Sequence, residues 1–139
     1  MKKIKTSLWS SIRKLIKFWA VPIGCGLLFL FLLQFVFFVG YVPSASMEPT
    51  IKENSLIFGI RVFGEMHRGD IVVFVHDGRQ LVKRIAGVPG DKVYAGGQAL
   101  TVPAGCYFVL GDNSEDSVDS RYWDNPFVPR ENITAVLPR

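Results

Sequence analysis

The pattern of apolar and polar positions divides the chain into two parts. Residues 20–42 form a run of 23 positions without a charged side chain. A helix rises 1.5 Å per residue, so a run of this length extends about 34 Å, enough to cross the hydrocarbon core of a bilayer. The pattern therefore predicts one transmembrane helix over 20–42 and a separate domain over 43–139.

Beyond residue 43 the apolar positions fall into short runs that are typical of β-strands. The runs are rich in Val, Ile and Phe, and Gly, Pro or Asp bounds each of them. Asp77-Gly78 joins two runs and indicates a hairpin, because both residues tolerate positive φ. No stretch has the periodicity of an amphipathic helix, so we expect a mostly β domain. The expected strands are 55–62, 71–76, 80–86, 92–94, 106–110 and 133–137.

Positive charge is concentrated before the apolar run. Segment 1–19 carries six Lys and Arg side chains and no acid, whereas 43–139 carries ten basic side chains and all twelve acidic ones. Basic residues beside a span mark its cytoplasmic side, so we expect 1–19 in the cytoplasm and 43–139 outside. The outer part is nearly neutral, and its charge therefore does not indicate nucleic-acid binding.

Two further interpretations of the N-terminal region are open. The first treats 1–19 as an amphipathic helix on the inner leaflet that leads into the span. The second treats 20–42 as part of a cleaved signal peptide, since Ser44-Ala45-Ser46 resembles the small-x-small pattern of a cleavage site. The apolar part of a signal peptide covers roughly 7–15 residues, so the length favours a retained anchor. The apolar positions of the amphipathic helix are Leu8, Trp9, Ile12, Leu15, Ile16 and Trp19.

The cysteines and histidines indicate neither a disulfide nor a metal site. Cys25 falls in the apolar run and Cys106 in the outer domain, so the geometry of a bridge between them is implausible. Neither cysteine has a metal-ligand spacing to His67 or His76, and no HExxH or CxxC motif occurs. We expect no cofactor and no metal.

A candidate nucleophile, Ser46, lies directly after the apolar run in PSASMEPT, residues 43–50. A serine hydroxyl is unreactive until a base removes its proton. His67 and His76 are candidate bases, but both lie in turn-like surroundings where histidines are usually solvated. Lysine is the other candidate, and it acts as a base only if burial lowers its pKa by roughly 3 units.

Lys83 is the lysine whose surroundings suit that requirement. In QLVKRIA, residues 80–86, a strand places Lys83 on one face with Leu81 and Ile85, while Arg84 points to the other face. Burial in an aliphatic row lowers the pKa of a lysine. The alternative is a half-exposed strand from which the Lys83 amine reaches water.

A polar loop, GDNSEDSVDSR, follows the apolar run that ends at Leu110. It is no EF-hand, because Ser117 stands where the sharp-turn glycine belongs and no bidentate Glu follows at the twelfth position. It is either a plain solvated loop or a structured element in which Asp119 pairs with Arg121 and holds the serines in place.

Four motifs in order, PSASMEPTI, GDIVVF, LVKRIAGVPGDKV and GDNSEDSVDSRYW, follow the predicted anchor. Together they resemble the bacterial type I signal peptidases, Ser-Lys endopeptidases of peptidase family S26. The resemblance covers about residues 42–137 and implies a partly barrel-like β domain at the outer face of the cytoplasmic membrane. It also implies signal peptides of exported precursors and the lipid bilayer as partners.

The resemblance assigns a role to each matching residue. Ser46 is implied as nucleophile and Lys83 as general base. The Ser44 hydroxyl and the Ser46 backbone N–H are implied as the oxyanion hole. The remaining positions are implied to orient the lysine or support the site: Ser117, Asp119, Arg121, Gly111 and Asn113.

The sequence departs from the family pattern in the loop. Ser114 replaces the usual arginine, and Asp124-Asn125-Pro126 stands where a single glycine commonly precedes Phe-Val-Pro. The chain also lacks a large inserted β domain and a second span, so it is similar to the shorter single-span members. Two other functions are open: a dedicated peptidase for conjugation or pilin precursors, and a non-catalytic membrane-tethered binding module. Soluble self-cleaving repressors share a Ser-Lys fold, but the span and the Ser-Met-x-Pro motif argue against them.

Overall fold

The computed structural model describes residues 2–138, with side chains at residue 14 and from residue 16 onward. It divides into two compact units, Met1–Val36 and Phe37–Arg139. We describe each unit by itself.

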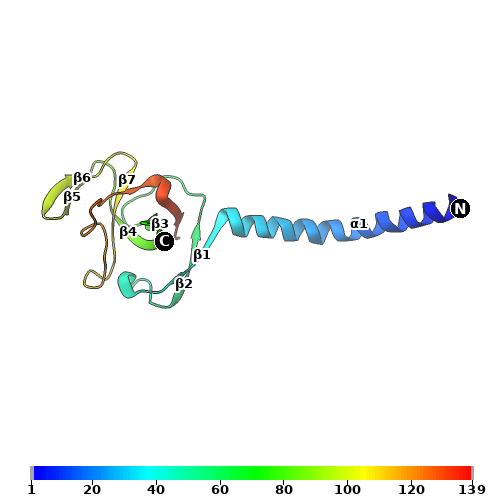
Figure 1. Ribbon diagram of the computed structural model, residues 1–139, viewed down its shortest axis with the longest axis horizontal. Coiled ribbons are helices and arrows are strands. Elements are labelled where there is room, and N and C mark those ends of the chain that lie inside the picture. The colour runs from blue at the N-terminus through cyan, green and yellow to red at the C-terminus, as the bar shows by residue number, and fades with distance from the viewer. Residues whose placement is uncertain (1, 139) are drawn as a thin grey trace. The chain divides into compact units, whose positions relative to one another are not determined.

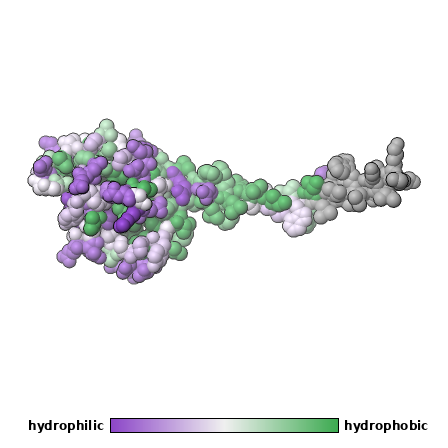
Figure 2. Space-filling view, in the orientation of Figure 1, coloured by the Kyte–Doolittle hydropathy of each residue, from purple (hydrophilic) through white to green (hydrophobic). Residues whose placement is uncertain are grey.

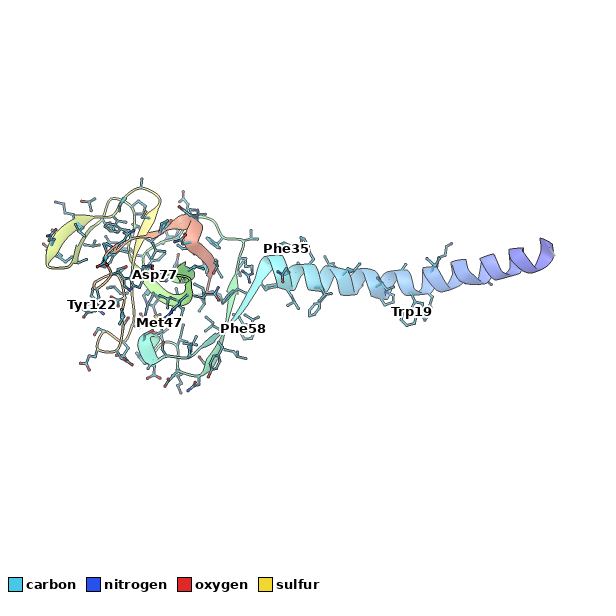
Figure 3. All side chains as sticks on the ribbon, in the orientation of Figure 1. Trp19, Phe35, Met47, Phe58, Asp77 and Tyr122 are labelled. Carbon is cyan, nitrogen blue, oxygen red and sulfur yellow. The ribbon has the colours of Figure 1, made fainter. Side chains whose placement is uncertain are left out.

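The first unit is helical. Helix α1 spans Lys2–Phe31 and continues into a π-helical turn, η1, at Leu32–Val36. Segment Ile16–Val36 is long and apolar enough to cross a membrane, with a mean hydropathy of 2.1. Figure 2 shows this apolar surface, from which Trp19 and Phe35 project (Figure 3). The side chains of the proposed amphipathic face at Leu8, Trp9, Ile12 and Leu15 lie outside the described ones.

The helix ends before the predicted residue 42. Phe37–Val42 instead forms strand β1, which pairs antiparallel with β2 from Phe37↔Ile60 to Val42↔Ser55. The prediction of a helix over the last six residues of 20–42 is therefore wrong. An unbroken apolar run does not distinguish helix from strand, and here pairing with a distant segment decides the matter.

The second unit is a mostly antiparallel β domain, as predicted (Figure 1). Seven strands form one sheet in the order β1-β2-β9-β3-β4-β7-β8, and β5 and β6 form a separate hairpin. The further strands are β2 (Ser55–Ile60), β3 (Ile71–His76), β4 (Arg79–Gly87), β5 (Lys92–Ala95), β6 (Gln98–Thr101), β7 (Cys106–Leu110), β8 (Val128–Pro129) and β9 (Ile133–Val136), with 3₁₀ turns η2 (Ala45–Met47) and η3 (Arg130–Asn132).

The six expected strands all occur, with ends that differ by at most two residues. The Asp77-Gly78 hairpin joins β3 to β4, and both residues have positive φ, 48° and 72°. Strands β6 and β8 were not predicted. Strand β8 has only two residues, too few for an alternation of apolar and polar side chains, and in β6 only one residue of four is even partly buried, so its sequence carries little apolar signal.

The core lies on both faces of the central strands. On β3, Val72 and Phe74 join one apolar cluster while Val73 joins another, so successive side chains are buried on opposite faces. Met47, at the end of η2, is fully buried in the second cluster (Figure 3). The apolar core therefore anchors the chain immediately after Ser46.

Candidate active site

Ser46 lies in the short 3₁₀ turn η2 that follows β1. Its side chain is buried, with 7% of the residue exposed. The hydroxyl of Ser44 lies 3.3 Å from that of Ser46, so the two predicted serines share one location. Anchoring by Met47 on the C-terminal side and by β1 on the N-terminal side fixes this turn in the domain.

The backbone of this turn is held by the 111–121 loop. Asn113 donates its backbone N–H to the Ser46 carbonyl at 3.1 Å and its side-chain amide to the Ala45 carbonyl at 3.2 Å. Gly111 packs tightly here, because a Cβ at this position would lie 2.6 Å from the Ser46 carbonyl oxygen and 2.5 Å from Ser117 Cβ. Gly111 therefore packs against Ser46 and Ser117, and Asn113 hydrogen-bonds to the Ser46 turn.

Lys83 is buried on β4, with 3% of the residue exposed. It shares its face with buried Ile85, as strand alternation predicted, and the alternative of an amine reaching water is wrong. The amine donates a hydrogen bond to Ser117 Oγ at 3.0 Å. Arg84 points to the other face and pairs with Asp112.

Ser117 links Lys83 to a buried carboxylate. Its hydroxyl donates to Asp119 Oδ2 at 2.8 Å, while its oxygen accepts from the Lys83 amine. Asp119 is fully buried and receives the Arg121 guanidinium on both oxygens at 2.9 Å, which confirms the predicted pair. The Gly111 N–H also donates to Asp119 at 2.9 Å. Because the only Ser117 proton goes to Asp119, Ser117 must act as an acceptor for Lys83.

The electrostatics lower the pKa values of both Lys83 and Asp119. Burial is the main cause that lowers the pKa of the Lys83 amine from 10.5, and Arg121 acts in the same direction, while Asp119, Asp116 and Asp112 act against it. Burial raises the pKa of Asp119, but hydrogen bonds led by that from Arg121 outweigh it, so its pKa lies below the usual value. Asp119 is therefore ionised throughout the pH range in which Lys83 loses its proton.

A groove of about 420 Å³ runs over these residues. Ser44, Ser46 and Lys83 all line it, together with residues of β1 and β4 and two residues of the loop, Asp116 and Val118. Neither candidate histidine lines the groove: His67 lies near Asp70, and the His76 ring stacks on Trp123. The structure thus brings the predicted serines and lysine together at one cavity and leaves the histidines outside it.

Two contributors were not predicted. Arg84 donates to Asp112 with two of its nitrogens and to the Gly69 carbonyl at 2.8 Å, which ties β4 to the loop. Asp116 lines the groove. Arg84 and Asp112 are separated by 28 positions, and one sequence gives no signal that pairs them. The alternation in β4 indicated only that Arg84 faces away from Lys83.

Comparison with known proteins shows a consistent family. The family model described as "Signal peptidase, peptidase S26" matches residues 12–102 and 95–138. Signal peptidase I S of Bacillus subtilis is 32% identical over 149 residues, covering 80% of this chain and 81% of that protein. A Synechocystis protein named "Probable signal peptidase I-2" is 36% identical over 129 residues, covering 67% and 57%.

A solved structure of a signal peptidase I from Enterococcus faecalis aligns with a TM-score of 0.44 and 28% identity, covering 55% of this chain and all of that one. The chain spans somewhat over half the length of some relatives, 57% for the Synechocystis protein and 59% for signal peptidase I of Pseudomonas aeruginosa. The family-model match, by contrast, runs through nearly the whole chain. The chain belongs to the signal peptidase family, peptidase S26.

Proposed function

We propose that this protein is a membrane-anchored serine endopeptidase that removes signal peptides from exported precursors, with Ser46 as nucleophile and Lys83 as general base. The observation that carries the proposal is the buried Lys83 amine, hydrogen-bonded to Ser117 and lining the same groove as Ser46. The relatives named signal peptidase I support the assignment of the substrate class.

The hydrogen-bond directions suit Lys83 as a base. A neutral amine has two protons and one lone pair, and one proton of Lys83 is donated to Ser117. Because the Ser117 hydroxyl donates its hydrogen bond to the Asp119 carboxylate, it does not donate to the amine. The lone pair of Lys83 thus stays available for the Ser46 proton.

The proposed reaction has two steps. Lys83 removes the proton of Ser46, and Ser46 Oγ attacks the carbonyl carbon that ends the signal peptide. The Ser44 hydroxyl and the Ser46 N–H donate to the developing oxyanion, an interaction worth roughly 3–4 kcal/mol per donor in such sites. Lys83 then gives its proton to the leaving amine, and water releases the acyl group from Ser46.

The groove suits an extended substrate. Its lining comes mainly from strands β1 and β4, so a peptide that lies extended along them presents alternate side chains to the groove. We propose that the residues at −1 and −3 enter it. Most of the lining is apolar, including Phe38, Val42 and Leu81, which favours apolar side chains at these positions. That these side chains are small is implied by the resemblance to the type I signal peptidases.

Cleavage of a preprotein in detergent tests the two main roles. Ser46→Ala removes the nucleophile, and Lys83→Arg keeps the charge but removes the base, because arginine stays protonated. We expect both variants to lose cleavage by at least about a thousandfold, the scale seen when a unit of this kind is broken. Full activity of either variant would show that its role is wrongly assigned.

We also propose that segment 1–19 lies in the cytoplasm and 43–139 outside the bacterial cytoplasmic membrane. Six basic residues before the apolar segment support this orientation. The test uses a variant in which Cys25 and Cys106 are replaced by serine, in spheroplasts, where the outer face of the cytoplasmic membrane is accessible. A membrane-impermeant thiol reagent should then label Tyr94→Cys but not Ser10→Cys. Labelling of Ser10→Cys alone would contradict the orientation.

A further inference from the structure

One charged side chain of the groove has no contact with the reacting groups in the proposed mechanism and acts there only through its charge, which opposes the lowering of the Lys83 pKa. Among the described lining residues only Lys83 and Asp116 carry a charged group, and the others are apolar or neutral. Lys83 works as a neutral amine in the proposed reaction. The reactive form of the groove therefore has one charge, the negative charge of Asp116.

The Asp116 carboxylate is available to a ligand. The other two aspartates of the loop that lie near Lys83 already form ion pairs, Asp112 with Arg84 and Asp119 with Arg121. For the Asp116 side chain, no hydrogen bond or ion pair occurs within residues 2–138. Its side chain is exposed, so a substrate can reach it.

The position of Asp116 relative to the nucleophile is fixed by the backbone. Asp116 donates its N–H to the Asn113 carbonyl at 3.2 Å, and Asn113 donates its own N–H to the Ser46 carbonyl at 3.1 Å. One residue further along, Ser117 accepts the hydrogen bond of Lys83. Asp116 thus sits beside the reacting end of the groove on a segment tied to both Ser46 and Lys83.

We propose that Asp116 determines specificity and makes the groove prefer precursors with a basic side chain within two residues of the cleaved bond. This inference rests on the proposed function, because it assumes a peptide in the groove. A lysine or arginine there meets the single carboxylate, whereas an acidic side chain is repelled by it.

The size of the effect follows from the exposure of the carboxylate. Water screens a pair at such a site, and exposed ion pairs contribute modestly, so we expect about a threefold preference for Lys over Gln and about tenfold for Lys over Glu. The charge of the substrate side chain does not change during the reaction. The preference should therefore appear in KM rather than in kcat.

The test uses the full-length protein in detergent and peptides that share one signal-peptide cleavage sequence. Each peptide carries Gln, Lys or Glu at −2, +1 or +2, and kcat and KM are measured at low and high salt. At one or more positions the wild type should show the Lys preference, and high salt should weaken it. Asp116→Asn should bring the Lys-to-Gln ratio close to one, and Asp116→Lys should favour Glu.

Glu115→Gln is the matched control, since Glu115 is an exposed acid next in sequence that does not line the groove. It should keep the wild-type preference and the wild-type rate on the Gln peptide. A wild-type ratio near one at all three positions, or a preference that survives in Asp116→Asn, would overturn the inference while leaving the protease assignment intact. Failure of the wild type to cleave even the Gln peptide would overturn the proposed function and this inference with it.

Discussion

Replacement of Gly111 by alanine tests how tightly the loop holds the site. A Cβ at this position would lie 2.6 Å from the Ser46 carbonyl oxygen, 2.5 Å from Ser117 Cβ and closer still to Ser117 Oγ. Two of these atoms belong to Ser117, which accepts the hydrogen bond of the Lys83 amine, and the third belongs to Ser46, the proposed nucleophile. The perturbation therefore reaches both sides of the proposed dyad at once.

The magnitude follows from the contact distances. Carbon contacts shorter than about 3.4 Å force movement, so Ser46 or Ser117 must shift by about 1 Å, a displacement that can lower an enzyme rate about a hundredfold. Crowding a packed site also costs about 1–3 kcal/mol of stability. We expect Gly111→Ala to lower kcat/KM about a hundredfold, with a Tm lower by several degrees.

The assay is peptide cleavage well below the Tm, with the fraction of folded protein measured in parallel. Gly64→Ala is the matched control, because its added Cβ would meet no atom within 4 Å and Gly64 has an ordinary φ. It should keep the wild-type rate and Tm. Wild-type activity in Gly111→Ala, or a loss that matches the unfolded fraction, would refute the reasoning.

Two further predictions concern Lys83. Burial lowers the pKa of its amine from 10.5, and only the neutral amine acts as a base; the cleavage rate should therefore rise with pH to a plateau, with a midpoint below 10.5. A rate that stays constant well below pH 6 would contradict a lysine base. Ser117→Ala removes the acceptor of the amine, and we expect kcat to fall about ten- to a hundredfold with KM little changed, as measured by steady-state kinetics. Ser120→Ala is the control for the loss of a buried loop hydroxyl, because the Ser120 hydroxyl accepts a hydrogen bond from the Val109 N–H and not from Lys83. Equal losses of kcat in the two variants would mean that Ser117 acts only on the fold.

Much of the fold could be predicted because strands and hairpins leave local signals. The six expected strands are alternating or β-branched runs, and Asp77-Gly78 has the positive φ values that its turn requires. Strand β1 could not be predicted in this way. Its residues are part of an apolar run that also suits a helix, and its partner β2 begins 13 residues after β1 ends.

The sequence by itself determined the apolar segment, the strand pattern and the face of β4 that carries Lys83, because each depends on periodicity within a few residues. The burial of Lys83 on that face was left open by the sequence and was decided by the tertiary structure. The motifs also placed Ser44, Ser46, Ser117 and the Asp119–Arg121 pair among the candidates. Only the tertiary structure decided which groups meet. It brought Lys83 into hydrogen-bond contact with Ser117, paired Arg84 with Asp112 and placed Asp116 in the groove. Each of these contacts joins residues 28 or more positions apart. Such contacts depend on sheet order and loop packing, and neither follows from local periodicity.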